Sequence, residues 1–314
     1  MNVLVTGGAG FMGGHVTRAL LSSGDDVAVL DNLSTGARAN LDPRCEFLPG
    51  DVRDSDRVSA VMQGRDAVVH LAAYTSVPES FREADLCFEV NVEGTLNVLD
   101  AAVRAGVPKV VFASSSAVYA DEPDGPKLET MCPGPCSPYA VSKLEGEHLL
   151  AWFRRRRGLH TTALRFFNVY GPRQDASSDY AAVIPIFIER ALAGETLTIY
   201  GNGQQTRDFI YAQDVADAVL ASLRSPYCGV LNVGTGRAVR ILDLAEQVLS
   251  LTGSKGGYVF ADRRPGDAAS STADISAIVR DLEWTPGIGL EQGLSQTLRW
   301  FRGQNGSGEG HGRA

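Results

Sequence analysis

The sequence begins with Val3-Leu4-Val5-Thr6 and continues with Gly7-Gly8-Ala9-Gly10-Phe11-Met12-Gly13, and this stretch decides the fold. The short β-branched run before the glycines predicts a strand that is buried on both faces. The glycines predict a tight turn, and an amphipathic helix is expected from Gly14 to Ser23. A glycine-rich turn between a strand and a helix allows a pyrophosphate to approach the helix N-terminus closely. The stretch therefore favours a dinucleotide site.

A second predicted strand runs from Asp26 to Leu30 and is followed by Asp31, 18 residues after Gly13. A carboxylate at this position hydrogen-bonds the ribose hydroxyls and repels a 2′-phosphate, so NAD is favoured over NADP. Asn91 is expected to open a long helix over residues 92–105. Further strands are expected at 46–52, 67–71, 107–113 and 161–166, alternating with helices. This alternation predicts an α/β fold, a Rossmann-type doubly wound parallel sheet with a smaller mixed α/β substrate-binding lobe on the C-terminal side.

The chain is expected to divide into three parts. Residues 1–168 form the predicted NAD-binding domain, to which segments near 209–235 return. Residues 169–302 form most of the substrate lobe, with short elements that include a turn at 232–236. Residues 303–314 are Gly-rich and polar and are predicted to be a disordered tail.

Composition limits the possible functions. Charged residues make up 21% and hydrophobic ones 44% of the 314 residues, which is typical of a globular protein. The net charge of −8 argues against nucleic acid as a partner. No apolar run approaches the ~18 residues of a membrane helix, and no signal peptide is expected, so we expect a cytoplasmic protein. The five cysteines and five histidines are dispersed, which predicts reduced thiols, no metal site and a structural role for His70.

A candidate catalytic helix begins in Ser137-Pro138-Tyr139-Ala140-Val141-Ser142-Lys143. Ser137 is expected to be the N-cap and Pro138 the first helical residue. Tyr139 and Lys143 are four residues apart and would share one face of the helix. The free pKa of tyrosine is ~10, and a nearby ammonium and a cationic cofactor ring both favour the phenolate. The pair can therefore act as a general base toward a hydroxyl group.

Other candidates follow the carboxyl ends of predicted strands, where ligands meet open parallel sheets. Asp51 and Val52 could flank an adenine, and the small residues Ala72 and Ala73 would let a cofactor lie against backbone. A serine cluster at 114–116 could supply a hydroxyl beside the base. A solvated serine-rich loop is the alternative interpretation of that cluster.

Together these fragments resemble the extended short-chain dehydrogenase/reductase family, and within it the UDP-hexose 4-epimerases. The resemblance spans nearly the whole chain, from Val3 to Trp300. It is carried by Val5-Thr6-Gly7-Gly8-Ala9-Gly10-Phe11, Asp31-Asn32-Leu33, Asp51-Val52, Leu71-Ala72-Ala73, Asn91, Ser114-Ser115-Ser116-Ala117-Val118-Tyr119, Tyr139-Ala140-Val141-Ser142-Lys143, Asn168-Val169-Tyr170-Gly171-Pro172-Arg173-Gln174, Arg207-Asp208-Phe209 and Arg264-Pro265-Gly266-Asp267.

The resemblance implies a role for each matching residue. Tyr139 would be the base, Lys143 would bind the nicotinamide ribose, and Ser115 would hydrogen-bond the sugar 4-hydroxyl. The residues expected to bind NAD are Gly7, Gly10, Phe11, Met12, Asp31, Asn32, Ser34, Gly36, Asp51, Val52, Leu71, Ala72, Ala73, Thr75, Asn91, Ser114, Tyr139, Lys143 and Phe166. The residues expected to bind a UDP-sugar are Val77, Ser115, Ser116, Tyr139, Asn168, Val183, Thr198, Tyr200, Arg207, Arg264, Asp267 and Ser271.

The residues after Ser115 separate the branches of the family. At the positions that match 115–119, the family's 4,6-dehydratases have a motif similar to Thr-Asp-Glu-Val-Tyr. The two carboxyl groups of that motif catalyse the elimination of water. This chain has Ser115-Ser116-Ala117-Val118-Tyr119, so elimination is not supported. The resemblance then implies reversible oxidation at C4: hydride passes to tightly held NAD, the 4-keto sugar rotates, and hydride returns to its other face. A UDP-glucuronate 4-epimerase or decarboxylase, or another NDP-sugar epimerase, remains the alternative.

Two further expectations follow from the resemblance. In the family, a small residue seven positions after the arginine that matches Arg264 admits an N-acetyl group, and here that residue is Ser271. UDP-GlcNAc and UDP-GalNAc are therefore expected substrates beside UDP-glucose and UDP-galactose. Family members are usually homodimers, and the helices at 92–105 and 139–153 would form the contact. A non-enzymatic NAD sensor on this fold is disfavoured, because such proteins usually lose the Tyr/Lys pair.

Overall fold

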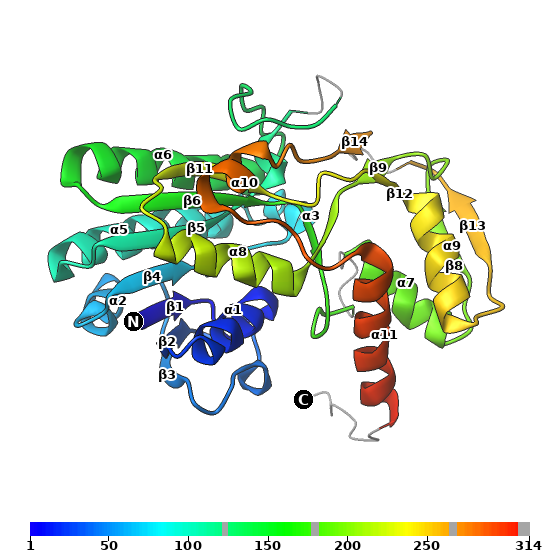
Figure 1. Cartoon of the computed structure of the whole chain (residues 1–314), viewed down its shortest axis with the longest axis horizontal. Helices are drawn as coiled ribbons and strands as arrows, with labels where there is room; N and C mark the ends of the chain where they lie inside the picture. Colours follow the sequence, from blue (N-terminus) through cyan, green and yellow to red (C-terminus); the bar gives the residue numbers. More distant parts are fainter. Residues whose placement is uncertain (121–124, 177–181, 264–268, 307–314) are drawn as a thin grey trace.

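The computed structural model describes residues 1–120, 125–176, 182–263 and 269–306. Within these residues, seven parallel strands form the main sheet in the order β11-β6-β5-β4-β1-β2-β3 (Figure 1). The chain order reverses beside β1, as in a doubly wound fold, which confirms the predicted fold class. The strands are β1 (Asn2–Thr6), β2 (Asp26–Asp31), β3 (Glu46–Pro49), β4 (Ala67–His70), β5 (Lys109–Ser115), β6 (His160–Phe166) and β11 (Gly229–Val233).

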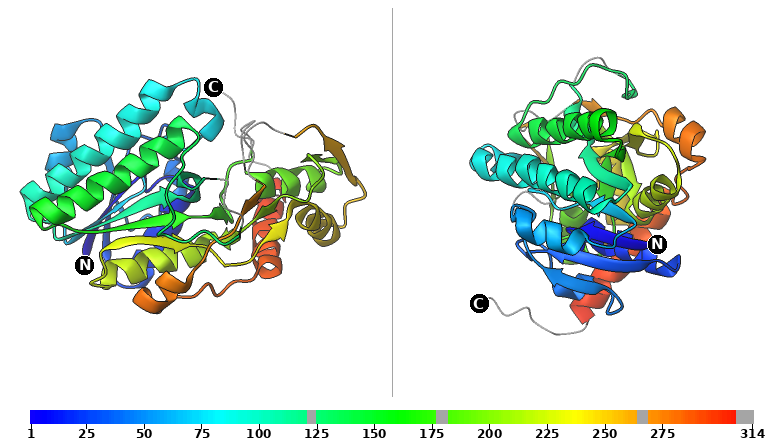
Figure 2. Two further views of the ribbon diagram at one scale, coloured as in Figure 1. Left: turned by 90° about the horizontal axis from the view of Figure 1, so that it is seen from above. Right: turned by 90° about the vertical axis from the view of Figure 1, so that its left-hand side faces the viewer.

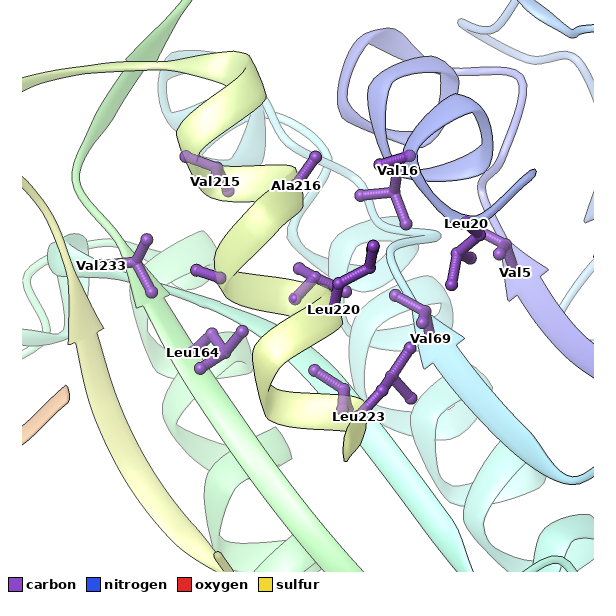
Figure 3. Packing of buried hydrophobic residues seen from close by; sticks show 14 of the residues in the cluster. Val5, Val16, Leu20, Val69, Leu164, Val215, Ala216, Leu220, Leu223 and Val233 are labelled. Atoms are coloured by element: carbon purple, nitrogen blue, oxygen red, sulfur yellow. The ribbon is translucent and has the colours of Figure 1, made fainter. Parts of the chain in front are cut away.

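Helices cover both faces of this sheet (Figure 2). One face is covered by α2 (Ser55–Met62), α5 (Gly94–Ala105) and α6 (Pro138–Arg157), and the other by α1 (Phe11–Ser22), α8 (Ala212–Arg224) and α10 (Ser276–Leu282). Figure 3 shows α8 beside α1 over the same face of the sheet, with Val16, Leu220 and Leu223 among the buried side chains gathered between these helices and the strands. Because helices cover both faces, the central strands β1, β2 and β4 are buried along nearly their whole length rather than at alternate residues.

A smaller lobe follows the main sheet at the carboxyl ends of its strands (Figure 1). Its core contains Ile184, Leu197, Ile199, Leu244 and Leu298. It consists of α7 (Val183–Leu192), α9 (Ile241–Thr252) and α11 (Leu290–Gly306), with the paired strands β8 (Leu197–Tyr200) and β13 (Tyr258–Ala261).

Short elements connect the two parts of the molecule. The small sheets are β7 (Asn168–Tyr170) with β10 (Phe209–Tyr211), and β12 (Val239–Arg240) with β9 (Thr206–Arg207) and β14 (Ser270–Ser271). The remaining short helices are η1 (Arg38–Asn40), α3 (Val77–Ser80), α4 (Ala84–Phe88), the π-helical η2 (Glu89–Glu93) and η3 (Ser116–Val118). None of the described helices has both the length and the apolar character needed to cross a bilayer.

The structure corrects several predicted boundaries. Helix α1 begins at Phe11, because Gly10 is already its N-cap. Asn91 does not open a helix; it lies inside a π-helical turn between α4 and α5. The predicted turn at 232–236 begins one residue before the end of β11, whose pairing with β6 the sequence did not reveal. Helix α11 continues to Gly306, past the residue at which a tail was expected, and 307–314 lie outside the described residues.

His70 has the structural role that its apolar surroundings predicted. Its Nδ1 and the Thr6 hydroxyl are hydrogen-bonded at 2.6 Å, and its Nε2 and the Thr95 hydroxyl at 3.0 Å. Burial lowers the pKa of His70 to about 3, so the ring is neutral. All five cysteines, each in the described part of the chain, are free thiols. Among the described residues, His, Cys, Asp and Glu side chains do not gather into a group that could hold a metal ion.

Candidate active site

The glycine turn between β1 and α1 leaves no room for side chains. Gly7 has a φ of 70°, and a Cβ there would lie 2.5 Å from the backbone nitrogen of Ala72. Gly13 likewise lies against the Gly7 carbonyl and would collide with it if it carried a Cβ. Gly10, Phe11 and Met12 form the N-terminus of α1, whose amides favour negative charge. This turn fits a dinucleotide pyrophosphate.

Asp31 lies at the carboxyl end of β2, beside the glycine turn. Its side chain is buried and accepts hydrogen bonds from the amides of Ala9 at 2.9 Å and Leu33 at 2.8 Å. A carboxylate offers about four acceptor positions, so two more donors can be accommodated. Gly36 packs against the Ala9 backbone on the same side. The arrangement fits the ribose hydroxyls of NAD.

The surface predicted to bind the adenine end of NAD is a polar rim formed by residues after β2 and β3. The Asn32 amide donates to Asp51 at 2.8 Å, and the Ser34 amide donates to the Asn32 side chain at 3.0 Å. Hydrogen bonds from Arg53 lower the pKa of Asp51 to about 2, so Asp51 is ionised. Val52 is buried behind this rim. These residues lie together, as expected for one binding surface.

Asn91 supports the cofactor surface from behind. Its side chain is buried, accepts from the Tyr74 amide at 2.7 Å and donates to the Tyr74 carbonyl at 3.0 Å and to the Ser142 hydroxyl at 2.8 Å. These bonds hold the segment after β4, which contains Leu71, Ala72, Ala73 and Thr75. Both polar atoms of the Asn91 side chain bond the protein, and its expected contact with NAD stays a prediction.

The N-terminus of the catalytic helix has the predicted geometry. Ser137 caps α6 and accepts from the Ala140 amide at 3.1 Å, which confirms the expected start. The Tyr139 amide, which has no partner in its own helix, donates to Ser80 at 3.2 Å. Lys143 is buried, donates to the Ala113 carbonyl at 2.9 Å, and its Nζ lies 5.8 Å from the centre of the Tyr139 ring. The helix therefore presents Tyr139 and Lys143 on one face.

The protonation of this pair differs from the expected one. Burial raises the pKa of Tyr139, and a hydrogen bond with Ser115 opposes this increase only in part. Burial lowers the pKa of Lys143 to about 8. We expected the Lys143 ammonium to favour the phenolate, but in the protein alone desolvation outweighs the attraction. A bound cationic group would lower the pKa of Tyr139 and so favour the base.

The three serines after β5 have different surroundings. Ser115 is half-buried and interacts with Tyr139, and its hydroxyl also accepts from the Ala117 amide at 3.1 Å. Ser114 points to the opposite face of the strand and donates to Glu147 at 2.5 Å. The Ser114 hydroxyl is therefore directed away from Ser115, and the NAD contact expected of Ser114 stays a prediction. Ser116 begins η3 and lines the cleft described next.

A cleft of about 1300 Å³ separates the main sheet from the smaller lobe. It contains both predicted catalytic hydroxyls, and Phe166 and Thr75 from the cofactor side. Ten of the twelve predicted substrate residues line it, while Arg264 and Asp267 lie outside the described residues. The ten are Val77, Ser115, Ser116, Tyr139, Asn168, Val183, Thr198, Tyr200, Arg207 and Ser271.

Two buried carboxylates near the site were not among the predicted site residues. Asp208 is fully buried and accepts from the Thr235 amide and hydroxyl at 2.8 and 2.6 Å, from Gly236 at 2.9 Å and from Ala273 at 3.1 Å. Its amide donates to the Ser271 carbonyl at 2.8 Å, so it joins the strands that carry Arg207 and Ser271. Glu147 is buried on α6 beside the catalytic pair. The sequence signal for Asp208 was its place in the fragment Arg207-Asp208-Phe209, to which the resemblance assigned no role for the carboxylate.

Comparisons with known proteins agree with this site. Residues 3–234 match the model of the NAD dependent epimerase/dehydratase family. The UDP-glucose 4-epimerase of Thermotoga maritima, solved with UDP-glucose, is 38% identical with a TM-score of 0.95, covering 97% of this chain and 100% of that one. The UDP-N-acetylglucosamine 4-epimerase of Methanobrevibacter ruminantium, in complex with UDP-N-acetylmuramic acid, is 40% identical with a TM-score of 0.93, covering 96% and 98%.

A third solved structure contains the expected cofactor. The UDP-glucose 4-epimerase of Thermus thermophilus, in complex with NAD, is 40% identical with a TM-score of 0.91 and covers 96% of this chain and 99% of that one. The family match covers well over half of this chain, and the glycine turn and Asp31 fit the dinucleotide that the family uses. The chain therefore belongs to the NAD-dependent epimerase/dehydratase family and is an enzyme that uses NAD.

Proposed function

We propose that this enzyme is an isomerase, a UDP-hexose 4-epimerase that interconverts UDP-glucose with UDP-galactose and UDP-GlcNAc with UDP-GalNAc. The observation that carries the proposal is the shared cleft. Tyr139 and Ser115 line one wall, while Arg207 and Ser271 line another. A sugar held between these walls by its diphosphate would present a hydroxyl to the base.

The chain's own residues would divide the work. Arg207 would bind phosphate oxygens, for which a guanidinium is well shaped. Thr198 and Tyr200 of β8 would contact the uracil, as the resemblance implies. Tyr139 would take the C4 hydroxyl proton through Ser115, and Lys143 would hold the nicotinamide ribose. NAD, when bound, accepts a hydride from the sugar and returns it.

The cleft favours epimerisation over elimination of water. Elimination needs an acid and a base near the sugar, besides the tyrosine. Among the described residues that line the cleft, Glu189 of α7 is the only carboxylate. Residues 116 and 117, where dehydratases of this family have two carboxyls, are Ser116 and Ala117 in η3.

Room beside Ser271 supports the N-acetylated substrates. Ser271 is half-buried in β14 and lies opposite Arg207 of β9 in the parallel ladder. A sugar whose diphosphate is bound by Arg207 would therefore approach residue 271. A serine leaves space there that a tyrosine would fill.

The test incubates purified protein, without added NAD, separately with UDP-galactose, UDP-GalNAc and UDP-glucuronate. Interconversion of the first two supports the proposal. Turnover of the glucuronate alone would instead support a glucuronate epimerase or decarboxylase. In a Ser271→Tyr variant, UDP-GalNAc turnover should fall at least about 10-fold, the effect of roughly 1.4 kcal/mol of lost binding, while UDP-galactose turnover serves as the internal control. Unchanged UDP-GalNAc turnover would remove the argument from Ser271.

We also propose that the enzyme is a homodimer. Helices α5 and α6 lie side by side at one edge of the molecule (Figures 1 and 2). Each carries a large apolar side chain directed to solvent: Leu96 on α5 is 44% exposed and Trp152 on α6 is 51% exposed. Paired helices with such residues are typical of a four-helix contact between two copies.

A further inference from the structure

A buried polar cluster lies directly behind the catalytic residues. Glu147 of α6 accepts two hydrogen bonds from Arg165 of β6, at 2.8 and 2.7 Å, and one from Ser114 of β5 at 2.5 Å. The charged side chains are only 4% and 5% exposed. Burial lowers the pKa of Arg165, but its bonds and its attraction to Glu147 outweigh this, so the net shift is upward and the guanidinium is charged.

The cluster connects the parts of the structure that contain the catalytic residues. Glu147 follows Tyr139 by eight residues and Lys143 by four, so the three share one face of α6. Ser114 precedes Ser115 in β5, and Arg165 is opposite Ser114 in the ladder between β5 and β6. Each residue of the cluster is therefore next to one that lines the cleft or holds the base.

Two adjacent bonds fix the register of α6 against β5. Lys143 bonds the Ala113 carbonyl and Glu147 bonds the Ser114 hydroxyl. Between them, Gly146 packs so tightly on the strand that a Cβ would lie 2.5 Å from the Phe112 ring. A small slip of the helix would separate Tyr139 from Ser115. Because an isolated buried charge is costly, Arg165 and Glu147 also resist separation.

We propose that Ser114 and the Glu147–Arg165 ion pair are positioning residues, which hold Tyr139 in hydrogen-bonding reach of Ser115. The idea concerns the same site as the proposed epimerase function and rests on it for the turnover readout. Lys143 and the Cys87 thiol are the other titratable groups that act on Tyr139, and the substitutions below leave both unchanged. Ser114, Glu147 and Arg165 are not among the described residues that line the cleft.

The decisive variant is Ser114→Ala, which removes one hydroxyl and leaves both charges paired. The matched control is Ser222→Ala, because Ser222 is equally buried, on α8, and its hydroxyl bonds no described residue. In NAD-loaded protein, the phenol of Tyr139 is titrated by tyrosinate absorbance, with Tyr139→Phe in each background as the blank. The Ser115 bond lowers the pKa of Tyr139. Loss of this bond in Ser114→Ala should therefore raise the pKa of Tyr139 by about 0.5 to 1. In Ser222→Ala the pKa of Tyr139 should equal that of the parent protein.

Turnover provides the second readout. Ser114→Ala should lower kcat about 10-fold with an unchanged KM, since orientation is lost and binding is not. In a Ser115→Ala background the same change should have less than about a twofold effect, because Ser114 acts through Ser115. Two results would overturn the proposal, even if the Ser114→Ala protein melts at a lower temperature. One is a Tyr139 pKa that is unchanged in Ser114→Ala, and the other is a kcat in the Ser114→Ala/Ser115→Ala double variant that is reduced by the product of the two single effects. If the parent turned over no UDP-sugar, the epimerase function would fail, and the titration would still decide this proposal.

Discussion

In the proposed mechanism the chemistry depends on one phenol, Tyr139, which loses and regains a proton. Replacing it with phenylalanine keeps the ring and removes the base. A positioned general base contributes typically 10²–10⁴-fold, so Tyr139→Phe should lower kcat by about that factor. Affinity for UDP, which lacks the sugar, should stay near its parental value, since the phenol is expected to contact the sugar and the nicotinamide rather than the UDP. A variant with nearly parental kcat would show that another group takes the proton.

The titration of Tyr139 should depend on the cofactor. In the protein alone, burial raises its pKa, and burial lowers the pKa of Lys143 to about 8. The oxidised nicotinamide ring is cationic and favours a nearby phenolate, so the pKa of Tyr139 should be lower in NAD-loaded than in NAD-free protein. Activity should therefore rise with pH through the lower value. Tyrosinate absorbance measured in both forms, against Tyr139→Phe, checks this; identical values would contradict it.

At the scale of elements, Asp208 joins the strand that carries Arg207 to the strand that carries Ser271. In Asp208→Asn, one of the two carboxylate oxygens that accept hydrogen bonds from backbone amides becomes an N–H₂ group. That group can only donate, so it loses its bonds to those amides. Losing such bonds costs about 1–3 kcal/mol, so KM for the UDP-sugar should rise about 10-fold or more, with NAD retained. Asp214 is the matched control, because it is a buried carboxylate that holds the Gly287 and Ile288 amides away from the cleft. Asp214→Asn should lower stability and leave KM unchanged; equal KM changes in both variants would refute the specific role of Asp208.

These elements also show what a sequence can predict. The catalytic helix was predictable because its signals are local: Ser137 caps it, and Tyr139 and Lys143 are one turn apart. The contacts of buried polar side chains could not be predicted, because their partners are distant in the chain. Asp208 meets Ala273 65 residues later, and Glu147 meets Ser114 33 residues earlier. An isolated carboxylate in a sequence gives no indication of its partners.

At the scale of the whole molecule, the chain returns to its first domain after entering the second. Strand β11 joins the sheet beside β6, and α8 packs against α1, although both follow the first segments of the smaller lobe. Alternation of strands and helices predicted the first six strands and stops at β6. Segments near 209–235 were expected to return to the first domain, but the strand β11 within them was not predicted. Only contacts with β6 show where β11 belongs. The chain therefore passes several times between the main sheet and the smaller lobe, which form the two walls of the cleft.

The proposed dimer contact can be tested at the exposed face of α6. Trp152 is half exposed on α6, and aromatic side chains of this kind contribute strongly to contacts between proteins. Trp152→Glu would place a charge in an apolar contact, so light scattering should show a dimer for the parent and a monomer for the variant. Phe260 of β13 is the matched control, since it is 55% exposed but lies in the smaller lobe, far along the chain from α6. Phe260→Glu should remain dimeric. A parent that is monomeric, or a dimer lost only through Phe260→Glu, would exclude α5 and α6 as the contact.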